Sequence, residues 1–153
     1  TESTICLSGY VHSGYGEAVS ELLAFQGATA GWVFRGPEGH TSLHGGKNTQ
    51  VIGFSKGTHG LTSQEFQATS YSWERGKAVT TKSVLEMGLR ALRSGEETAL
   101  IDHLTREAAA HAFLAGHMAS FEEGQRLALD VVENGTALQT LERGLTILAG
   151  GGA

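Results

Sequence analysis

The sequence predicts an α/β domain with a partial parallel sheet of about three or four strands, flanked by helices and followed by a helical second half. Apolar runs of strand length alternate with an amphipathic segment near the start of the chain. From Thr80 onward the apolar residues recur at helical spacing. A length of 153 residues suits one domain with one core. We therefore expect a single domain at residues 1–149 and a flexible glycine-rich tail at residues 150–153.

The first elements form a strand-helix-strand unit. Residues 4–9 (TICLSG) and 30–35 (AGWVFR) are apolar runs typical of buried strands. Between them, residues 13–16 (SGYG) turn into an amphipathic helix that Gly27 ends. Two strands joined through a helix in one sheet lie parallel, with a right-handed crossover.

The middle of the chain is less regular. Residues 36–39 (GPEG) form a turn, and residues 40–48 are a loop rich in glycine and histidine. Residues 50–54 (QVIGF) are a third strand candidate that could lie at the sheet edge. The alternation in residues 66–72 also allows a strand.

The closing third contains two helices with their own start and stop signals. Ser120 followed by Glu123 is a capping box, and Asn134-Gly135 ends the helix that it opens. Thr136 with Gln139 repeats the capping signal. We expect the apolar residues of both helices to face inward: Leu127, Val131 and Val132 in the first, and Leu138, Leu141, Leu145 and Leu148 in the second.

Composition and charge narrow the classes of function. No apolar run approaches the roughly 20 residues that span a bilayer, so no membrane span is expected. A single cysteine, Cys6, allows no internal disulfide. The formal net charge is −5, and the basic residues gather only within residues 74–93. These could bind nucleic acid or form a solvated helix face, and the acidic overall charge favours the second. The residues are Arg75, Lys77, Lys82, Arg90 and Arg93.

The sequence suggests neither a catalytic group nor a resident metal. His40 and His44, with Glu38, could hold zinc if a helix carried them, but the neighbouring glycines indicate a loop. No serine or cysteine lies in a recognisable nucleophile motif. The paired glutamates at residues 96–97 and 122–123 lie at helix starts, where negative charge suits the helix dipole. We predict no catalytic residue and no cofactor.

Several segments together resemble a known family. They are residues 7–15 (LSGYVHSGY), 34–39 (FRGPEG), 83–118 and 120–142 (SFEEGQRLALDVVENGTALQTLE). The chain resembles the carboxy-terminal half of the anthranilate phosphoribosyltransferase family, whose fold is related to that of pyrimidine nucleoside phosphorylases. The likeness runs nearly end to end and is strongest in the closing segment. It implies an α/β fold whose other half supplies further strands of the same sheet.

The departures from the family bear on activity. Active members of the family place an Asp-Glu pair after the acidic turn, where it holds magnesium, and Thr41 and Ser42 stand at the similar positions here. Hydroxyls do not replace two carboxylates as ligands of Mg²⁺. The glycine-rich pyrophosphate loop of the family belongs to the half that this sequence lacks. The turn at residues 35–39 (RGPEG) is more similar to that of noncatalytic relatives, some of which bind nucleic acid.

A phosphate could still meet the turn between the first strand and the first helix. Backbone amides at such a turn favour anions, although a purely structural turn has the same composition. The candidate residues for phosphate or ligand binding are His12, Ser13, Gly14, Arg35 and Glu38.

The resemblance implies a noncatalytic phosphoribosyltransferase-like subunit that docks on another chain or larger assembly. One alternative is half of a split or processed transferase, active with a partner half and then using magnesium. A second alternative is a nucleic-acid-binding pseudoenzyme. The start at Thr1, without methionine or signal peptide, suggests a processed, soluble chain in the cytoplasm or inside an organelle such as a plastid.

Overall fold

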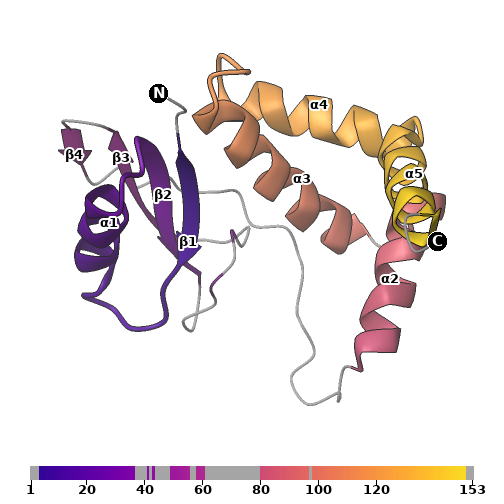
Figure 1. Cartoon of the computed structure of the whole chain (residues 1–153), viewed down its shortest axis with the longest axis horizontal. Helices are drawn as coiled ribbons and strands as arrows, with labels where there is room; N and C mark the ends of the chain where they lie inside the picture. The colour runs from indigo at the N-terminus through magenta and orange to yellow at the C-terminus, as the bar shows by residue number, and fades with distance from the viewer. Residues whose placement is uncertain are drawn as a thin grey trace.

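A sheet lies with one helix on one face and the helices of the second half of the chain extending from the other face (Figure 1). The computed structural model describes residues 4–36, 41, 43, 49–55, 58–60, 80–96 and 98–150. Its strands are β1 (Ile5–Gly9), β2 (Ala30–Arg35), β3 (Gln50–Ser55) and β4 (Thr58–Gly60). They lie in the order β1-β2-β3-β4. The predicted α/β class is confirmed.

The sheet is mixed rather than parallel throughout. β1 and β2 are parallel, as the strand-helix-strand unit predicts, with α1 (Gly16–Phe25) as the crossover. β3 pairs with β2 antiparallel, from Ala30 opposite Ser55 to Arg35 opposite Gln50. β4 pairs antiparallel with the far side of β3, so β3 is an inner strand and not an edge. The strand considered for residues 66–72 lies outside the described residues.

Each face of the sheet carries its own core because side chains alternate along a strand. Val33, Ile52 and Phe54 point to one face, where they meet the apolar side of α1. Trp32 and Phe34 point to the other face and meet Ala109 and Ala110 of α3 (Thr98–Leu114). Helix α3 therefore covers the face opposite α1 (Figure 1).

The other helices extend from α3 away from the sheet. They are α2 (Thr81–Ser94), α4 (Phe121–Glu133) and α5 (Thr136–Gly150). Gly124 of α4 lies against Ala109 so closely that an added Cβ would come within 3.2 Å of the Ala109 Cα. A small residue at this point allows α3 and α4 to approach, whereas α2 and α5 lie side by side at the far end of the pair (Figure 1).

The predicted helix boundaries of the closing third are partly right. Ser120 caps α4, because its hydroxyl accepts from the Glu123 N–H at 3.1 Å. The Glu123 carboxylate accepts from Ala119 N–H at 3.0 Å rather than from the cap residue. Asn134-Gly135 ends α4 with Gly135 at φ 78°, as expected.

Two predictions in this region are wrong. Thr136 is not a cap, since α5 already includes it and the Asn134 side chain accepts from its N–H at 2.9 Å. Leu127 is exposed, as are the leucines of α5 after Leu138, because no described element covers those helix faces. Gly150, expected in the tail, ends α5, and residues 151–153 lie outside the described part.

None of the described helices is both long enough and apolar enough to span a bilayer.

Candidate functional site

The carboxyl ends of β1 and β2 meet at one edge of the sheet, where parallel α/β folds commonly bind ligands. The backbone joins the two ends, since Tyr10 N–H donates to the Phe34 carbonyl at 3.0 Å. Arg35, the last residue of β2, donates from Nε to the Val11 carbonyl at 2.7 Å. Its guanidinium is thereby anchored to the turn that follows β1.

The turn from β1 into α1 is shaped by glycines. Gly14 has φ 96°, which favours glycine. Gly16 is buried, and a Cβ there would overlap the side chains of Ile52 and Tyr10. Helix α1 has no side-chain cap at Tyr15, so its first amides are left for solvent or an anion. The exposed rings of His12 and Tyr15 lie edge to face, 6.0 Å between centroids.

The side chain of Tyr10, at the start of this turn, is buried. Burial of the phenol raises its pKa above the ordinary value of 10.0, and the positive charge of Arg35 opposes that effect. The hydroxyl lies 3.4 Å from Gln50 Oε1, to which it donates. The phenol is thus neutral at physiological pH and acts as a hydrogen-bond donor rather than as a base.

The structure brings most of the predicted phosphate residues together. His12, Ser13 and Gly14 lie exposed in the turn, and Arg35 lies beside it. Glu38 lies outside the described residues, as do the metal candidates His40 and His44. Within the ranges that are described, no group of three or more His, Cys, Asp or Glu side chains could hold a metal ion.

The basic cluster is only partly within the described chain. Arg75 and Lys77 fall outside it, whereas Lys82, Arg90 and Arg93 lie on α2, where their spacing places them on one side of the helix. Lys82 Nζ lies 3.9 Å from the Glu86 carboxylate, on the same side. The Glu86 carboxylate offsets the positive charge of Lys82 on this side of α2.

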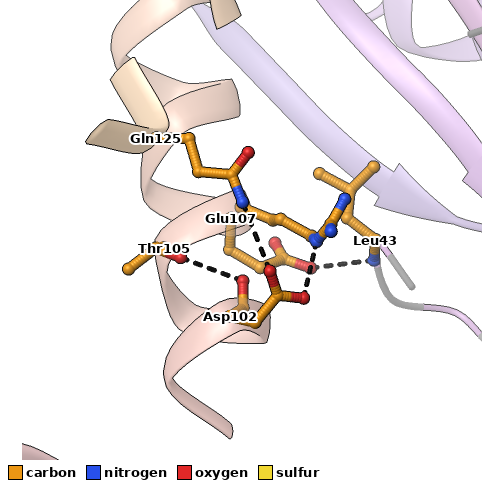
Figure 2. A network of polar contacts seen from close by, with 6 residues as sticks. Leu43, Asp102, Thr105, Glu107 and Gln125 are labelled. Atoms are coloured by element: carbon orange, nitrogen blue, oxygen red, sulfur yellow. Dashed lines mark hydrogen bonds and ion pairs between the residues drawn. The ribbon is translucent and has the colours of Figure 1, made fainter. Parts of the chain in front are cut away.

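A second polar cluster joins α3 to α4 (Figure 2). The Arg106 Nε donates to Asp102 Oδ2 at 2.8 Å, with the Arg106 side chain only 6% exposed. Gln125 of α4 donates to the other oxygen of Asp102 at 3.3 Å. The Thr105 hydroxyl donates to the Asp102 carbonyl at 3.0 Å. The sequence carried one signal for this cluster, the spacing of four between Asp102 and Arg106.

Helix α3 also contacts the segment that follows β2. Glu107 accepts a hydrogen bond from the backbone N–H of Leu43 at 3.1 Å, as Figure 2 shows. The Leu43 side chain is buried in the core between the sheet and α3. Sequence reasoning missed this contact because the two residues lie 64 positions apart.

Asp102 also lies in a groove of about 850 Å³ between the four helices α2 to α5. Ile101 and Thr105 of α3 form a buried part of its wall. Its other apolar residues are Leu92, Leu129, Val132 and Leu138. Its charged residues besides Asp102 are Arg93, Arg126, Glu122 and Glu133. The groove thus has an apolar lining and a rim of both charge signs.

Replacing Asp102 by alanine is expected to lower the free energy of unfolding by about 3 kcal/mol, because the buried guanidinium of Arg106 loses an anionic partner. Urea denaturation would measure the loss. Glu122→Ala, an exposed carboxylate on the rim of the same groove, is the matched control and should change stability by less than about 0.5 kcal/mol. Equal values for the two variants would show that the Asp102 contact is not a stabilising one.

No protein-family model matches the sequence, and no curated protein matches it. Among solved structures, the chain matches the crystal structure of anthranilate phosphoribosyltransferase (TrpD) from Thermus thermophilus, with a TM-score of 0.76 and 24% sequence identity. The chain has part of that fold. The match covers 96% of this chain and 44% of that one, so this chain spans less than half the length of the enzyme. The predicted resemblance to part of this fold is confirmed.

Proposed function

We propose that this chain is a noncatalytic, phosphoribosyltransferase-like subunit that docks on another polypeptide through the open edge of β1. The observation that carries the proposal is the position of β1. Among the described strands it pairs with β2 alone, and every one of its residues is half-buried. An apolar strand at the end of a sheet is a template for a further strand.

The backbone groups at this edge can be named. The Thr4 carbonyl accepts from Thr29 N–H at 2.8 Å, and Tyr10 N–H donates to the Phe34 carbonyl, so both residues face β2. In a strand, the N–H and the C=O of one residue both point to one neighbouring strand, and those of the next residue point to the other side. Ile5, Leu7 and Gly9 therefore present their backbone groups at the open edge, where a partner strand would bind.

The residues near the carboxyl end of β1 support a noncatalytic role. Thr41, which the family resemblance places where active members have a magnesium-binding carboxylate, lies directly against Gly9. A hydroxyl is a poor replacement for a carboxylate in a magnesium site. The turn can bring Arg35 and the amides of α1 to an anion.

The β1 contact can be tested by replacing Ile5 with proline. Proline lacks the N–H that a partner strand needs, but it leaves the ladder to β2 intact because Ile5 faces away from β2. On this proposal a partner polypeptide copurifies with the native chain, is lost in Ile5→Pro and is retained in the matched variant Ile5→Val. Mass spectrometry of the cross-linked native complex should place contacts at β1.

The proposal is wrong if Ile5→Pro, shown to be folded by circular dichroism, retains the same partner. It is also wrong if the cross-links fall only on residues far from β1.

A second candidate function is one half of a split transferase, favoured by the match to 44% of the solved enzyme. In that case the partner would supply the glycine-rich pyrophosphate loop and the magnesium ligands. Sequencing the copurified chain and assaying the complex for release of pyrophosphate from phosphoribosyl pyrophosphate with Mg²⁺ separate the two candidates. Release of pyrophosphate supports the split enzyme, and a partner without that loop supports the noncatalytic subunit.

A further inference from the structure

The turn between α4 and α5 contains a chemically labile pair of residues. Asn134 is followed by Gly135, which has no side chain to hinder attack of its backbone nitrogen on the asparagine amide. Asn134 is exposed, so water reaches it. The other asparagine of the sequence, Asn48, is followed by a threonine, whose branched side chain hinders the same attack. Asn134 is therefore the asparagine at which the chain modifies itself most readily.

The reaction needs no reagent other than water. The Gly135 backbone nitrogen loses its proton and forms a bond to Cγ of Asn134, while the bond from Cγ to Nδ2 breaks and ammonia leaves. The product is a cyclic imide, a succinimide. Water then opens the ring at either carbonyl carbon, which gives aspartate or isoaspartate, and in isoaspartate the main chain runs through the former side chain. The overall change converts a carboxamide and water into a carboxylate and ammonium.

The folded turn holds the reacting groups out of position. The ring closes only when the Gly135 nitrogen eclipses Cβ of Asn134, but ψ of Asn134 is 0°, where that nitrogen eclipses the Asn134 backbone nitrogen instead. The Gly135 N–H donates to the Val132 carbonyl at 3.1 Å, which retains the proton that the reaction must remove. Asn134 Oδ1 accepts from the Thr136 N–H at 2.9 Å, which fixes the side chain at the start of α5. The turn must open before the ring can form.

The two products differ in whether the turn can close again. Aspartate keeps an oxygen for the Thr136 N–H, and its charge lies beside the first turn of α5, where the helix dipole favours it. Isoaspartate lengthens the main chain by a methylene group. Gly135, at φ 78°, then no longer fits between its partners, the Val132 carbonyl and the Gln139 N–H.

We propose that Asn134 is a site of spontaneous deamidation, that opening of the α4–α5 turn limits the reaction, and that isoaspartate at this position prevents the turn from closing again. Leu138, in the first turn of α5, lines the groove beside Leu129 and Val132 of α4, so this contact is lost with the turn. The site lies in the helical half, away from β1, and does not depend on the function proposed above (Figure 1).

Mass spectrometry of the full chain during incubation at neutral pH is the first test. In the chain unfolded by guanidinium chloride, Asn134 should lose its amide several-fold faster than Asn48. In the folded chain, Asn134 should react at least about tenfold more slowly than in the unfolded chain. Folding should slow hydrogen exchange of the Gly135 amide by the same factor. Equal rates at Asn134 in the folded and unfolded chains would overturn the proposal, as would an unfolded chain in which Asn48 reacts as fast as Asn134.

Leu138→Ala tests whether opening of the turn sets the rate, because it leaves the reacting pair unchanged. The loss of its contact with α4 should speed both deamidation at Asn134 and hydrogen exchange of the Gly135 amide, by the same factor. Ile147→Ala is the matched control and should change neither rate, since Ile147 is 73% exposed and lies near the other end of α5. Faster exchange at Gly135 without faster deamidation would overturn the proposal.

Asn134→Asp separates the added charge from the lengthened main chain. This variant should keep the slow hydrogen exchange of the Gln139 amide, which donates to the Gly135 carbonyl at 3.1 Å. The isoaspartate form, isolated from aged protein, should lose that protection. Retained protection in the isoaspartate form would show that the turn still closes and would overturn that part of the proposal.

Discussion

Replacing Trp32 by alanine is expected to lower the free energy of unfolding by about 4 kcal/mol, which is a large fraction of the stability of a domain this size. Trp32 points from β2 toward the helical half, and its ring centroid lies 5.7 Å from those of Phe113 and Phe121. These rings join three elements, β2, α3 and the start of α4. Their loss leaves a cavity where the helices meet the sheet.

Urea denaturation followed by circular dichroism would measure this effect. Phe25→Ala is the matched control, because Phe25 is an aromatic residue of α1 with 89% of its surface exposed. It should change the free energy of unfolding by less than about 0.5 kcal/mol. If Trp32→Ala cost no more than this control, the aromatic contact would not join the sheet to the helices.

The second large effect is expected from Gly9→Ala, at about 3 kcal/mol. A Cβ on Gly9 would overlap the backbone carbonyl of Thr41, and backbone cannot move aside as a flexible side chain can. The displaced segment would carry Leu43, which is buried in the core and bonded to Glu107. Faster hydrogen exchange of the Leu43 amide should therefore accompany the loss of stability.

Gly88→Ala provides the control for the same chemical change. Gly88 lies inside α2, where an added Cβ meets nothing within 4 Å, so alanine should stabilise the chain by up to about 1 kcal/mol. A gain at Gly88 with no loss at Gly9 would contradict the close approach of Thr41 to β1.

The local elements of this fold could be predicted because their signals are local. The Ser120 cap, the left-handed Gly135 and the apolar run of β2 each depend on residues a few positions apart. The wrong assignment of Thr136 shows the limit of this approach. Thr136 has the residue type of a cap, but the structure places it inside α5, where its N–H donates to the Asn134 side chain.

The candidate site at the ends of β1 and β2 was predictable in part. His12, Ser13 and Gly14 are consecutive, so their shared turn follows from the sequence. The place of Arg35 beside them follows from the parallel pairing of the two strands. The Asp102 cluster reaches Gln125 across two helices, and that contact depends on how α3 packs on α4.

The sequence by itself determined the succession of β1, α1, β2 and β3, the bounds of α4 and the likeness to part of a phosphoribosyltransferase fold, but not β4. Hydrophobic period and capping residues carry that information over short distances. Only the tertiary structure decided that β3 runs antiparallel, that β1 remains at the edge, and that the α5 leucines face outward. An apolar stripe indicates that a helix face is buried. Which segment covers that face depends on packing between distant segments or between chains, which the stripe itself does not specify.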